Sequence, residues 1–255
     1  MSVQRLEEHR RLWEAKPVLR DVYAVWFDVL LEGLPAGARV LELGAGPGFL
    51  SRHVRARRPD LRWIGTDILA VPWNDLAADG LRMPFRDAAV DAVVGLDFIH
   101  HLARPARFFG EAARVLAPGG TLRVVEPWVT PFSFPVYRWL HQEGCRPRLD
   151  PWNPFGLGDE KDAFEGDAAV VWRLLRDTAP ARWGELGLAP PGWRVLNGFA
   201  YLASLGFRPH ALVPRSLARA LIGLDRAAGA LAPVMGMRAV VSWQRAGAAA
   251  TVPTA

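Results

Sequence analysis

An apolar strand that runs into three alternate glycines constrains the fold of this chain more than any other stretch. Residues 40–48 read Val-Leu-Glu-Leu-Gly-Ala-Gly-Pro-Gly, so Gly44, Gly46 and Gly48 follow the strand directly. Glycine lacks a Cβ and can adopt a positive φ, so the backbone can turn sharply there and lie against a ligand. The helix expected next would aim its N-terminus at the same place. The segment therefore predicts a Rossmann-type α/β unit that binds a nucleotide-like cofactor.

The spacing of these glycines separates two kinds of cofactor. The dinucleotide fingerprint G-x-G-x-x-G needs its third glycine three residues after the second. Here Gly48 follows Gly46 by two residues, which leaves the pattern E-x-G-x-G-x-G. An NAD-dependent oxidoreductase is therefore a disfavoured alternative.

The rest of the chain alternates between apolar runs and helical patterns. The segments expected to form strands are 39–43, 61–66, 75–78, 89–96, 121–125, 192–200 and 238–244. Helices are expected at 47–58 and 105–116. Such alternation predicts a parallel sheet with right-handed crossovers. The fold class is therefore a Rossmann-like, doubly wound, seven-stranded α/β sheet.

Length and composition indicate one domain with additions. With 255 residues, 51% of them hydrophobic, the chain suits a single α/β core. We expect residues 1–35 to form N-terminal cap helices, 36–245 the cofactor-binding domain and 246–255 a disordered tail. Residues 127–191 lose the alternation and are rich in tryptophan and proline. They predict an insertion, which is an irregular packed cap, a substrate-binding lid or both.

Acidic residues end several of the expected strands, at the edge where open α/β sheets bind ligands. Asp67 ends the second strand, Asp79 precedes Gly80 after the third, and residues 97–101 read Asp-Phe-Ile-His-His after the fourth. Together with the glycine loop and the stretch 116–122, these motifs resemble those of class I S-adenosylmethionine (SAM) dependent methyltransferases. The resemblance covers about residues 36–127 and is closest to the ubiquinone/menaquinone methyltransferase-like small-molecule branch.

The resemblance implies SAM as the cofactor and an antiparallel last strand. In that family the residue matching Asp67 accepts hydrogen bonds from both ribose hydroxyls, and those matching Asp79 and Gly80 read the adenine. The cofactor-binding residues implied in this sequence are Glu42, Gly44, Ala45, Gly46, Gly48, Asp67, Ile68, Asp79, Gly80 and Asp97.

Methyl transfer from a sulfonium is an in-line substitution, so alignment of donor and acceptor is the main requirement and a base is optional. His101 is the first candidate to remove an acceptor proton, because a histidine titrates near neutrality, and Glu126 is the second. A histidine pair in a turn is also a common hydrogen-bonding scaffold, which is the alternative for His100 and His101. No third ligand has an obvious spacing, so we expect no metal.

The residues after the fourth strand also bear on the acceptor. Amino-directed base methyltransferases carry D/N-P-P-Y/F at that position, whereas residues 96–99 read Leu-Asp-Phe-Ile. Nucleic acid is therefore an unlikely partner, although the basic C-terminal third keeps RNA methylation open. We expect a small or lipid-like hydrophobic acceptor, methylated first on oxygen and second on carbon. A SAM-binding protein without catalysis is a further alternative.

Two amphipathic segments leave alternatives open. In residues 215–231 the arginines 215, 219 and 226 oppose a row of leucines, which predicts either a helix packed on the sheet or peripheral contact with an anionic membrane. Lys16, Arg20 and Tyr23 share a face of an N-terminal helix. That face is either solvated, or its Lys16 or Arg20 pairs with the cofactor carboxylate or an acidic substrate.

The cellular compartment is predicted from features that the sequence lacks. The N-terminus has no apolar core of signal-peptide length, and no apolar run approaches the roughly 18 residues of a membrane span. A single cysteine, Cys145, excludes an internal disulfide. We therefore expect a cytoplasmic protein.

Overall fold

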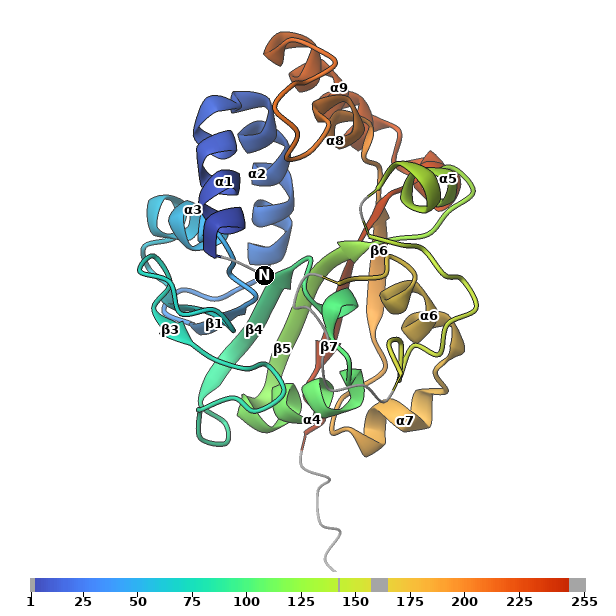
Figure 1. Ribbon diagram of the computed structural model, residues 1–255. Helices are drawn as coiled ribbons and strands as arrows, with labels where there is room; N and C mark the ends of the chain where they lie inside the picture. The colour runs from blue at the N-terminus through green and yellow to red at the C-terminus, as the bar shows by residue number, and fades with distance from the viewer. Residues whose placement is uncertain (1–2, 142, 157–164, 248–255) are drawn as a thin grey trace, which may run out of the picture.

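The computed structural model describes residues 3–141, 143–156 and 165–247 (Figure 1). Most of the expected tail, at 248–255, lies outside the described residues. The strands are β1 (Arg39–Leu43), β2 (Arg62–Asp67), β3 (Leu76–Ala77), β4 (Val90–Leu96), β5 (Leu116–Pro127), β6 (Gly192–Leu196) and β7 (Arg238–Gln244). They form one seven-stranded sheet in the order β3-β2-β1-β4-β5-β7-β6. Strand β7 runs antiparallel to both β5 and β6, and the pairings among β1 to β5 are parallel. The predicted fold class is confirmed.

Helices cover both faces of the sheet (Figure 1). They are α1 (Val3–Ala15), α2 (Pro17–Leu31), α3 (Phe49–Arg57), α4 (Pro105–Val115), α5 (Ser133–Pro135), α6 (Val170–Asp177), α7 (Pro180–Glu185), α8 (Phe199–Ser204), α9 (Arg215–Ala227) and α10 (Ala232–Met235). One apolar core joins the sheet to α4, α6 and α7, and the other joins it to α2 and α3. The central strands β1 and β4 are thus buried on both faces, which accounts for their nearly continuous apolar sequences.

The strand order reverses between β1 and β4, which is where such sheets bind ligands. The two strands pair directly, with Leu43 opposite Gly95. Gly95 has no room for a side chain, because a Cβ there would lie 2.3 Å from the Phe98 ring. A Cβ on Gly44, which has φ 65°, would lie 2.7 Å from the Phe98 Cβ. The glycines therefore let the loops after β1 and β4 pack tightly together.

The strand expected at 192–200 is wrong in its second half, because β6 ends at Leu196 and α8 begins at Phe199. The backbone N–H groups of Phe199 and Ala200 donate to the Asp225 carboxylate at 2.9 and 3.1 Å. A carboxylate satisfies the free N–H groups of a helix start, and it comes here from α9. That distant cap is invisible in the local sequence.

The first helix after the glycine loop begins at Phe49 rather than at residue 47. Gly48 adopts a left-handed φ of 78° and stands directly before the helix. The loop therefore extends through Gly48, and the helix follows it as expected.

Lys16 and Arg20 both bond to backbone carbonyl oxygens. The Lys16 ammonium donates to the carbonyl oxygens of Gly206 and Arg208 at 2.6 and 2.8 Å. The Arg20 guanidinium donates to the Trp13 and Glu14 carbonyls at 2.6 and 2.7 Å. These contacts tie the start of α2 to α1 and to the segment after α8, and neither side chain lines the cavity, which argues against the cofactor-carboxylate role expected for them.

Helix α9 turns Leu217 and Leu224 outward, whereas Leu221 and Ile222 pack partly buried against the apolar core. Leu217, Leu224 and Leu231 are 47%, 51% and 52% exposed, whereas Ala218 is buried. Arg215 and Arg219 pair with Asp21 on α2 instead of extending freely into water. The helix packs with its inner face against α2 and α8, rather than directly on the sheet, and membrane contact of its outer face stays a prediction. Among the described residues, no helix combines the length and the apolar character needed to cross a membrane.

Candidate active site

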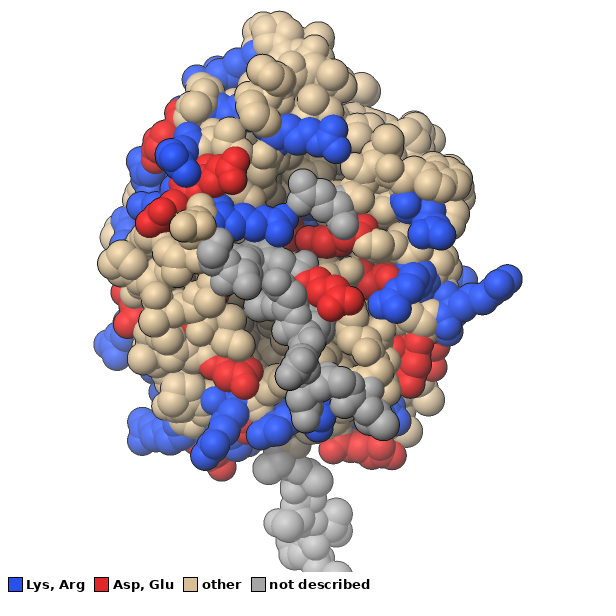
Figure 2. Space-filling view, in the orientation of Figure 1, with Lys and Arg blue, Asp and Glu red and all other residues tan. Residues whose placement is uncertain are grey.

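A cavity of about 1510 Å³ lies at the carboxyl ends of β1, β2 and β4. On the face drawn in Figure 2, acidic side chains gather near the middle of the molecule and a mostly uncharged surface lies above them. Ten of the twelve site residues predicted from the sequence line this cavity: Glu42, Gly44, Ala45, Gly46, Asp67, Ile68, Asp79, Gly80, Asp97 and His101. Gly48 and Glu126 do not line it. The strand-end residues thus come together as their shared sheet edge requires.

The glycine loop and Asp67 form one unit. The backbone N–H of Gly46 donates to Asp67 Oδ2 at 2.8 Å, and that of Leu69 donates to Oδ1 at 2.9 Å. Each carboxylate oxygen accepts more than one hydrogen bond, so both keep capacity for a ligand hydroxyl. Gly48 acts behind this unit, because a Cβ on it would lie 3.1 Å from the Trp73 ring. It shapes the loop rather than touching the cavity.

Asp79, Gly80 and Ile68 form the outer end of the cavity. The exposed Asp79 accepts the Leu81 N–H at 2.8 Å, which fixes the turn after β3. Ile68 is 59% exposed and offers an apolar surface beside Asp67. A flat aromatic ligand would have an apolar face and a hydrogen-bonding edge here.

Glu42 is buried under the loop with only 2% exposure. Its Oε2 accepts from Ser51 Oγ at 2.5 Å and from Trp63 Nε1 at 3.0 Å. Burial raises the pKa of this carboxyl from 4.5 to about 7, against the opposing effect of the two hydrogen bonds. Burial disfavours the charged form, so Glu42 titrates close to neutrality.

Asp97 follows β4 with a positive φ of 55° and pairs with Arg238 at the start of β7. The Arg238 guanidinium is 3% exposed and lies over the rings of Trp26 and Tyr201, at 4.7 and 5.0 Å from their centroids. Burial raises the pKa of Asp97, and Arg238 opposes that effect. Arg238 lines the cavity although it lies 141 residues after Asp97, and no motif or periodicity in the sequence predicts it there.

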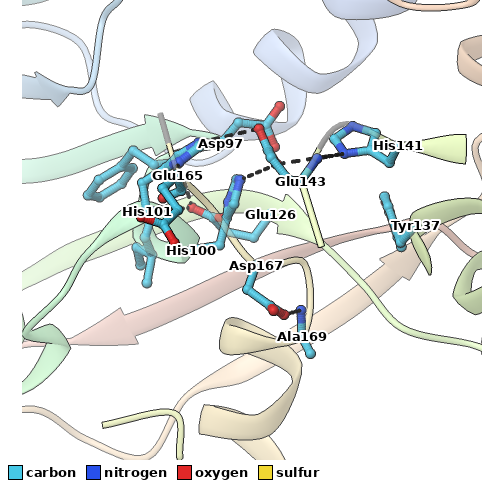
Figure 3. A network of polar contacts seen from close by, with 12 residues as sticks. Asp97, His100, His101, Glu126, Tyr137, His141, Glu143, Glu165, Asp167 and Ala169 are labelled. Carbon is cyan, nitrogen blue, oxygen red and sulfur yellow. Dashed lines mark hydrogen bonds and ion pairs between the residues drawn. The ribbon is translucent and has the colours of Figure 1, made fainter. Parts of the chain in front are cut away.

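A cluster of histidines and glutamates forms the wall beyond Asp97 (Figure 3). Glu126 is fully buried, and its Oε1 accepts the N–H groups of Phe98 and Ile99 at 3.0 and 2.7 Å. Its Oε2 lies 2.5 Å from His100 Nδ1. Both oxygens are engaged beneath the cavity, so Glu126 positions the turn after β4. This geometry argues against the general-base role predicted for it.

His100 joins Glu126 to a residue of the insertion. Its Nε2 lies 3.0 Å from Glu143 Oε2. Burial disfavours the His100 charge, but the two carboxylates outweigh burial and raise the pKa to about 10. Burial likewise opposes ionisation of Glu143, yet the neighbouring histidines hold its pKa below the ordinary value. The pair is therefore ionised across the neutral range.

His101 lines the cavity beside this pair. Its Nδ1 lies 3.2 Å from the Glu165 carbonyl oxygen, and its Nε2 lies 3.7 Å from Glu143 Oε1. A carbonyl only accepts, so Nδ1 carries the proton of the neutral ring and Nε2 carries the lone pair. Burial, reinforced by the His100 charge, lowers the pKa of His101 to about 4. The imidazole is neutral at pH 7 and points its lone pair toward Glu143.

Glu143 was missed because it lies in the insertion, 42 residues after His101. The one signal in the sequence is that three of the six histidines, His100, His101 and His141, lie among the 43 residues just before it. All three line the cavity together with Glu143.

Comparisons with known proteins agree with this geometry. Residues 41–124 match the family described as a methyltransferase domain. A probable SAM-dependent methyltransferase from Mycolicibacterium smegmatis is 35% identical over 181 residues, which cover 60% of this chain and 70% of that protein. The chain belongs to the SAM-dependent methyltransferases. Its alternating sheet and its E-x-G-x-G-x-G loop place it in class I of that family.

Other relatives match the same core. The demethylmenaquinone methyltransferase of Thermus thermophilus is 35% identical over 113 residues, which cover 39% of this chain and 50% of that protein. The chain thus spans about half the length of this relative. A SAM-dependent methyltransferase structure from Archaeoglobus fulgidus aligns with a TM-score of 0.54 at 14% identity, covering 88% of this chain and 94% of that one. At that identity the likeness concerns the fold alone.

The site fits the cofactor of this methyltransferase family, which is SAM. Gly44 and Gly46 line the cavity without a side chain, at positive φ values of 65° and 48°, and the Asp67 carboxylate stands at the loop with acceptor capacity on both oxygens. When bound, SAM supplies a methyl group already activated by the sulfonium. The residues able to hold it run from Asp79 through Asp67 to Glu42 and Asp97, all on the cavity.

Proposed function

We propose that this protein transfers the methyl group of SAM to a small or lipid-like hydrophobic acceptor, on an oxygen in the first instance and on a carbon in the second. The observation that carries the proposal is that one cavity joins Asp67 and the glycine loop to His101. Cofactor and acceptor can therefore lie side by side in it, which in-line transfer requires.

The cofactor half of the cavity binds and orients SAM. Asp67 accepts the two ribose hydroxyls, Asp79 and Gly80 read the adenine edge, and Ile68 covers the adenine face. Glu42 and the loop at Gly44–Gly48 lie under the methionine part, and Asp97 faces it from β4. Alignment of this kind accounts for most of the rate enhancement in a displacement whose leaving group is already activated.

His101 acts on the acceptor. As the acceptor oxygen bonds to the methyl carbon and the carbon–sulfur bond breaks, the hydroxyl proton becomes strongly acidic. A neutral imidazole accepts it even though its pKa is low, and S-adenosylhomocysteine leaves as the neutral product. Glu126 supports this step only through the turn that carries His100 and His101.

Aromatic side chains favour a hydrophobic acceptor. Tyr23, Phe27, Phe207 and Tyr201 all line the cavity. The exposed leucines of α9 lie on the chain segment that follows Phe207, and Arg226 is exposed among them. We therefore retain peripheral contact with an anionic membrane as part of the proposal.

Calorimetric titration tests the cofactor. We expect SAM and S-adenosylhomocysteine to bind and NAD to give no heat, with weaker SAM binding in Asp67→Asn and unchanged binding in the surface control Asp60→Asn. Binding of NAD without SAM would falsify the proposal. Once an acceptor is identified, His101→Gln should lose turnover while its SAM affinity stays the same. Full turnover in that variant would remove His101 from the mechanism.

A further inference from the structure

The acceptor wall is the part of the cavity beyond Asp97 that His100, His101, Glu126 and Glu143 form. Three of these side chains aim their ligand atoms at one point. One ring nitrogen of His100, one of His101 and a Glu143 carboxylate oxygen all lie within 4.8 Å of one another. Figure 3 shows the three converging from the turn after β4 and from the insertion. His100 Nε2 lies 3.0 Å from Glu143 Oε2, and His101 Nε2 lies 3.7 Å from Glu143 Oε1.

Both imidazoles are oriented as metal ligands are. Histidines that bind a metal through one nitrogen usually donate the other N–H to a carboxylate or a backbone carbonyl. The Nδ1 atom of His100 meets the Glu126 carboxylate at 2.5 Å, and the Nδ1 atom of His101 meets the Glu165 carbonyl at 3.2 Å. Each partner fixes its ring so that Nε2 faces Glu143.

The rings are also held by packing. Their centroids lie 4.1 Å apart. Gly166 packs against both rings, since a Cβ there would lie 2.8 Å from the His101 ring and 2.9 Å from His100 Cδ2. A glycine at this point lets the insertion close directly over the histidine pair. The ligand atoms are therefore preorganised rather than free to move apart.

The spacing agrees with coordination geometry. With bonds of about 2.0–2.2 Å, neighbouring ligand atoms around a tetrahedral or octahedral ion lie about 3.0–3.5 Å apart. The two distances to Glu143 are close to that range. His100 and Glu143 already bring together a buried nitrogen and a carboxylate that is 22% exposed toward the cavity side.

We propose that His100, His101 and Glu143 bind a divalent transition-metal ion, with Glu126 and the Glu165 carbonyl as the outer partners that orient the two rings. Two imidazoles and one carboxylate suit zinc, iron or manganese, whereas magnesium and calcium prefer all-oxygen sites. Three protein ligands leave at least one position open toward the cavity, as in metal sites that act on a substrate.

A metal ion here would take part in the methyl transfer proposed above, and this role rests on that proposed function. Its positive charge would stabilise the acceptor oxygen after loss of its proton, and that proton would pass to solvent. The oxygen then attacks the methyl carbon, the carbon–sulfur bond breaks, and S-adenosylhomocysteine leaves. His101 is then needed for turnover because it holds the ion rather than because it accepts the proton.

Protonation of His100 is the competing explanation for the close approach of His100 and Glu143. A doubly protonated His100 bridging Glu126 and Glu143 also accounts for the 3.0 Å contact. The two explanations differ in whether the chain takes up an ion, so metal binding decides between them without any knowledge of the acceptor.

The experiment uses the full-length protein, stripped with a chelator and titrated with zinc, manganese and magnesium salts. We expect one zinc or manganese ion per chain and no uptake of magnesium. Glu143→Gln and His101→Asn should weaken zinc binding at least 100-fold, while His210→Asn, at an exposed histidine outside the cavity, should bind as the parent does. Absence of stoichiometric binding, or equal binding by Glu143→Gln and His210→Asn, would overturn the inference.

Two further measurements keep the result decisive. If Glu143→Gln fails to fold, cobalt absorption of the unaltered protein still reports the ligand set, and a spectrum of hexaaqua type would overturn the site. SAM titration of the same samples separates the two proposals. Metal uptake without SAM binding defeats the proposed function, whereas SAM binding without metal uptake defeats only this inference.

Discussion

The two halves of the cavity are built in different ways. The cofactor half centres on backbone amides around the partly exposed Asp67 carboxylate, with Gly46 bonded to Asp67 across 21 residues of one β-α-β unit. The acceptor wall uses buried charged side chains, with Glu126, His100 and Glu143 linked in series. Backbone geometry is shared by every sheet of this type, whereas a buried charge network depends on each of its members. Function on the cofactor side is therefore tied to fold, and on the acceptor side to particular side chains.

The largest effect should come from breaking the acceptor wall. Glu126→Ala removes the acceptor of two backbone N–H groups and leaves His100 facing one carboxylate in a buried site. Removing one partner of a buried ion pair costs about 3–5 kcal/mol. We expect a loss of that size in the free energy of unfolding, measured by urea denaturation.

Its control is Glu14→Ala, which breaks a pair with Arg52 in which both side chains are more than half exposed. Exposed ion pairs contribute about 0–1 kcal/mol. Equal losses in the two variants would mean that the acceptor wall is no more dependent on its charges than the surface is.

The next largest effect is a pH dependence of stability caused by Glu42 in the cofactor half. Its pKa is about 7 in the folded protein and 4.5 in the reference state, so the folded chain binds the proton more tightly. This stabilisation is complete below pH 4.5 and is lost as the pH rises through about 7. The shift corresponds to at most about 3 kcal/mol.

Glu42→Gln removes the titrating group while keeping the side-chain shape. The difference in unfolding free energy between the parent and this variant should therefore fall between pH 5 and pH 8, with the parent losing stability relative to the variant. Parallel curves over that range would show that the pKa of Glu42 is not raised in the folded protein.

Sequence patterns located the cofactor half because its determinants are local. The order of strand, glycine loop and helix, and the aspartate after β2, follow from periodicity and from the need for a positive φ. The fold class and the strands β1 and β7 were predicted at their observed bounds. Ends set by distant partners were not, as for α8, which begins where Asp225 caps it.

The acceptor wall could be predicted only in part, because its contacts join segments far apart in the chain. His101 stood out through the motif after β4. Glu143 and Arg238 did not, since they come from the insertion and from β7 and have no periodic or motif signal. Glu126 was recognised as important for its position, but its depth below the cavity depends on how β5 packs between β4 and β7.

The third effect, which is smaller in energy, concerns SAM binding by the cofactor half. Asp67→Asn keeps the shape but turns one charged acceptor into a donor, which weakens hydrogen bonds to the ribose. We expect SAM affinity to fall about 10–100-fold, or about 1.4–2.7 kcal/mol, by calorimetry. The loss of unfolding free energy should stay smaller than in Glu126→Ala. The opposite ranking would contradict the division of roles between the two halves.

The smallest effect on stability is expected at the exposed leucines of α9. Leu217→Ser and Leu224→Ser alter side chains that are about half exposed and should change the free energy of unfolding by no more than about 0.5 kcal/mol. If α9 meets a membrane, the double variant should nevertheless lose flotation with anionic vesicles at low salt, while zwitterionic vesicles bind neither protein. Buried Ala218 is no suitable control, so exposed Leu212→Ser, just before the helix, serves instead. Equal flotation of the parent and the double variant would separate α9 from lipid and confine recognition of the acceptor to the cavity wall.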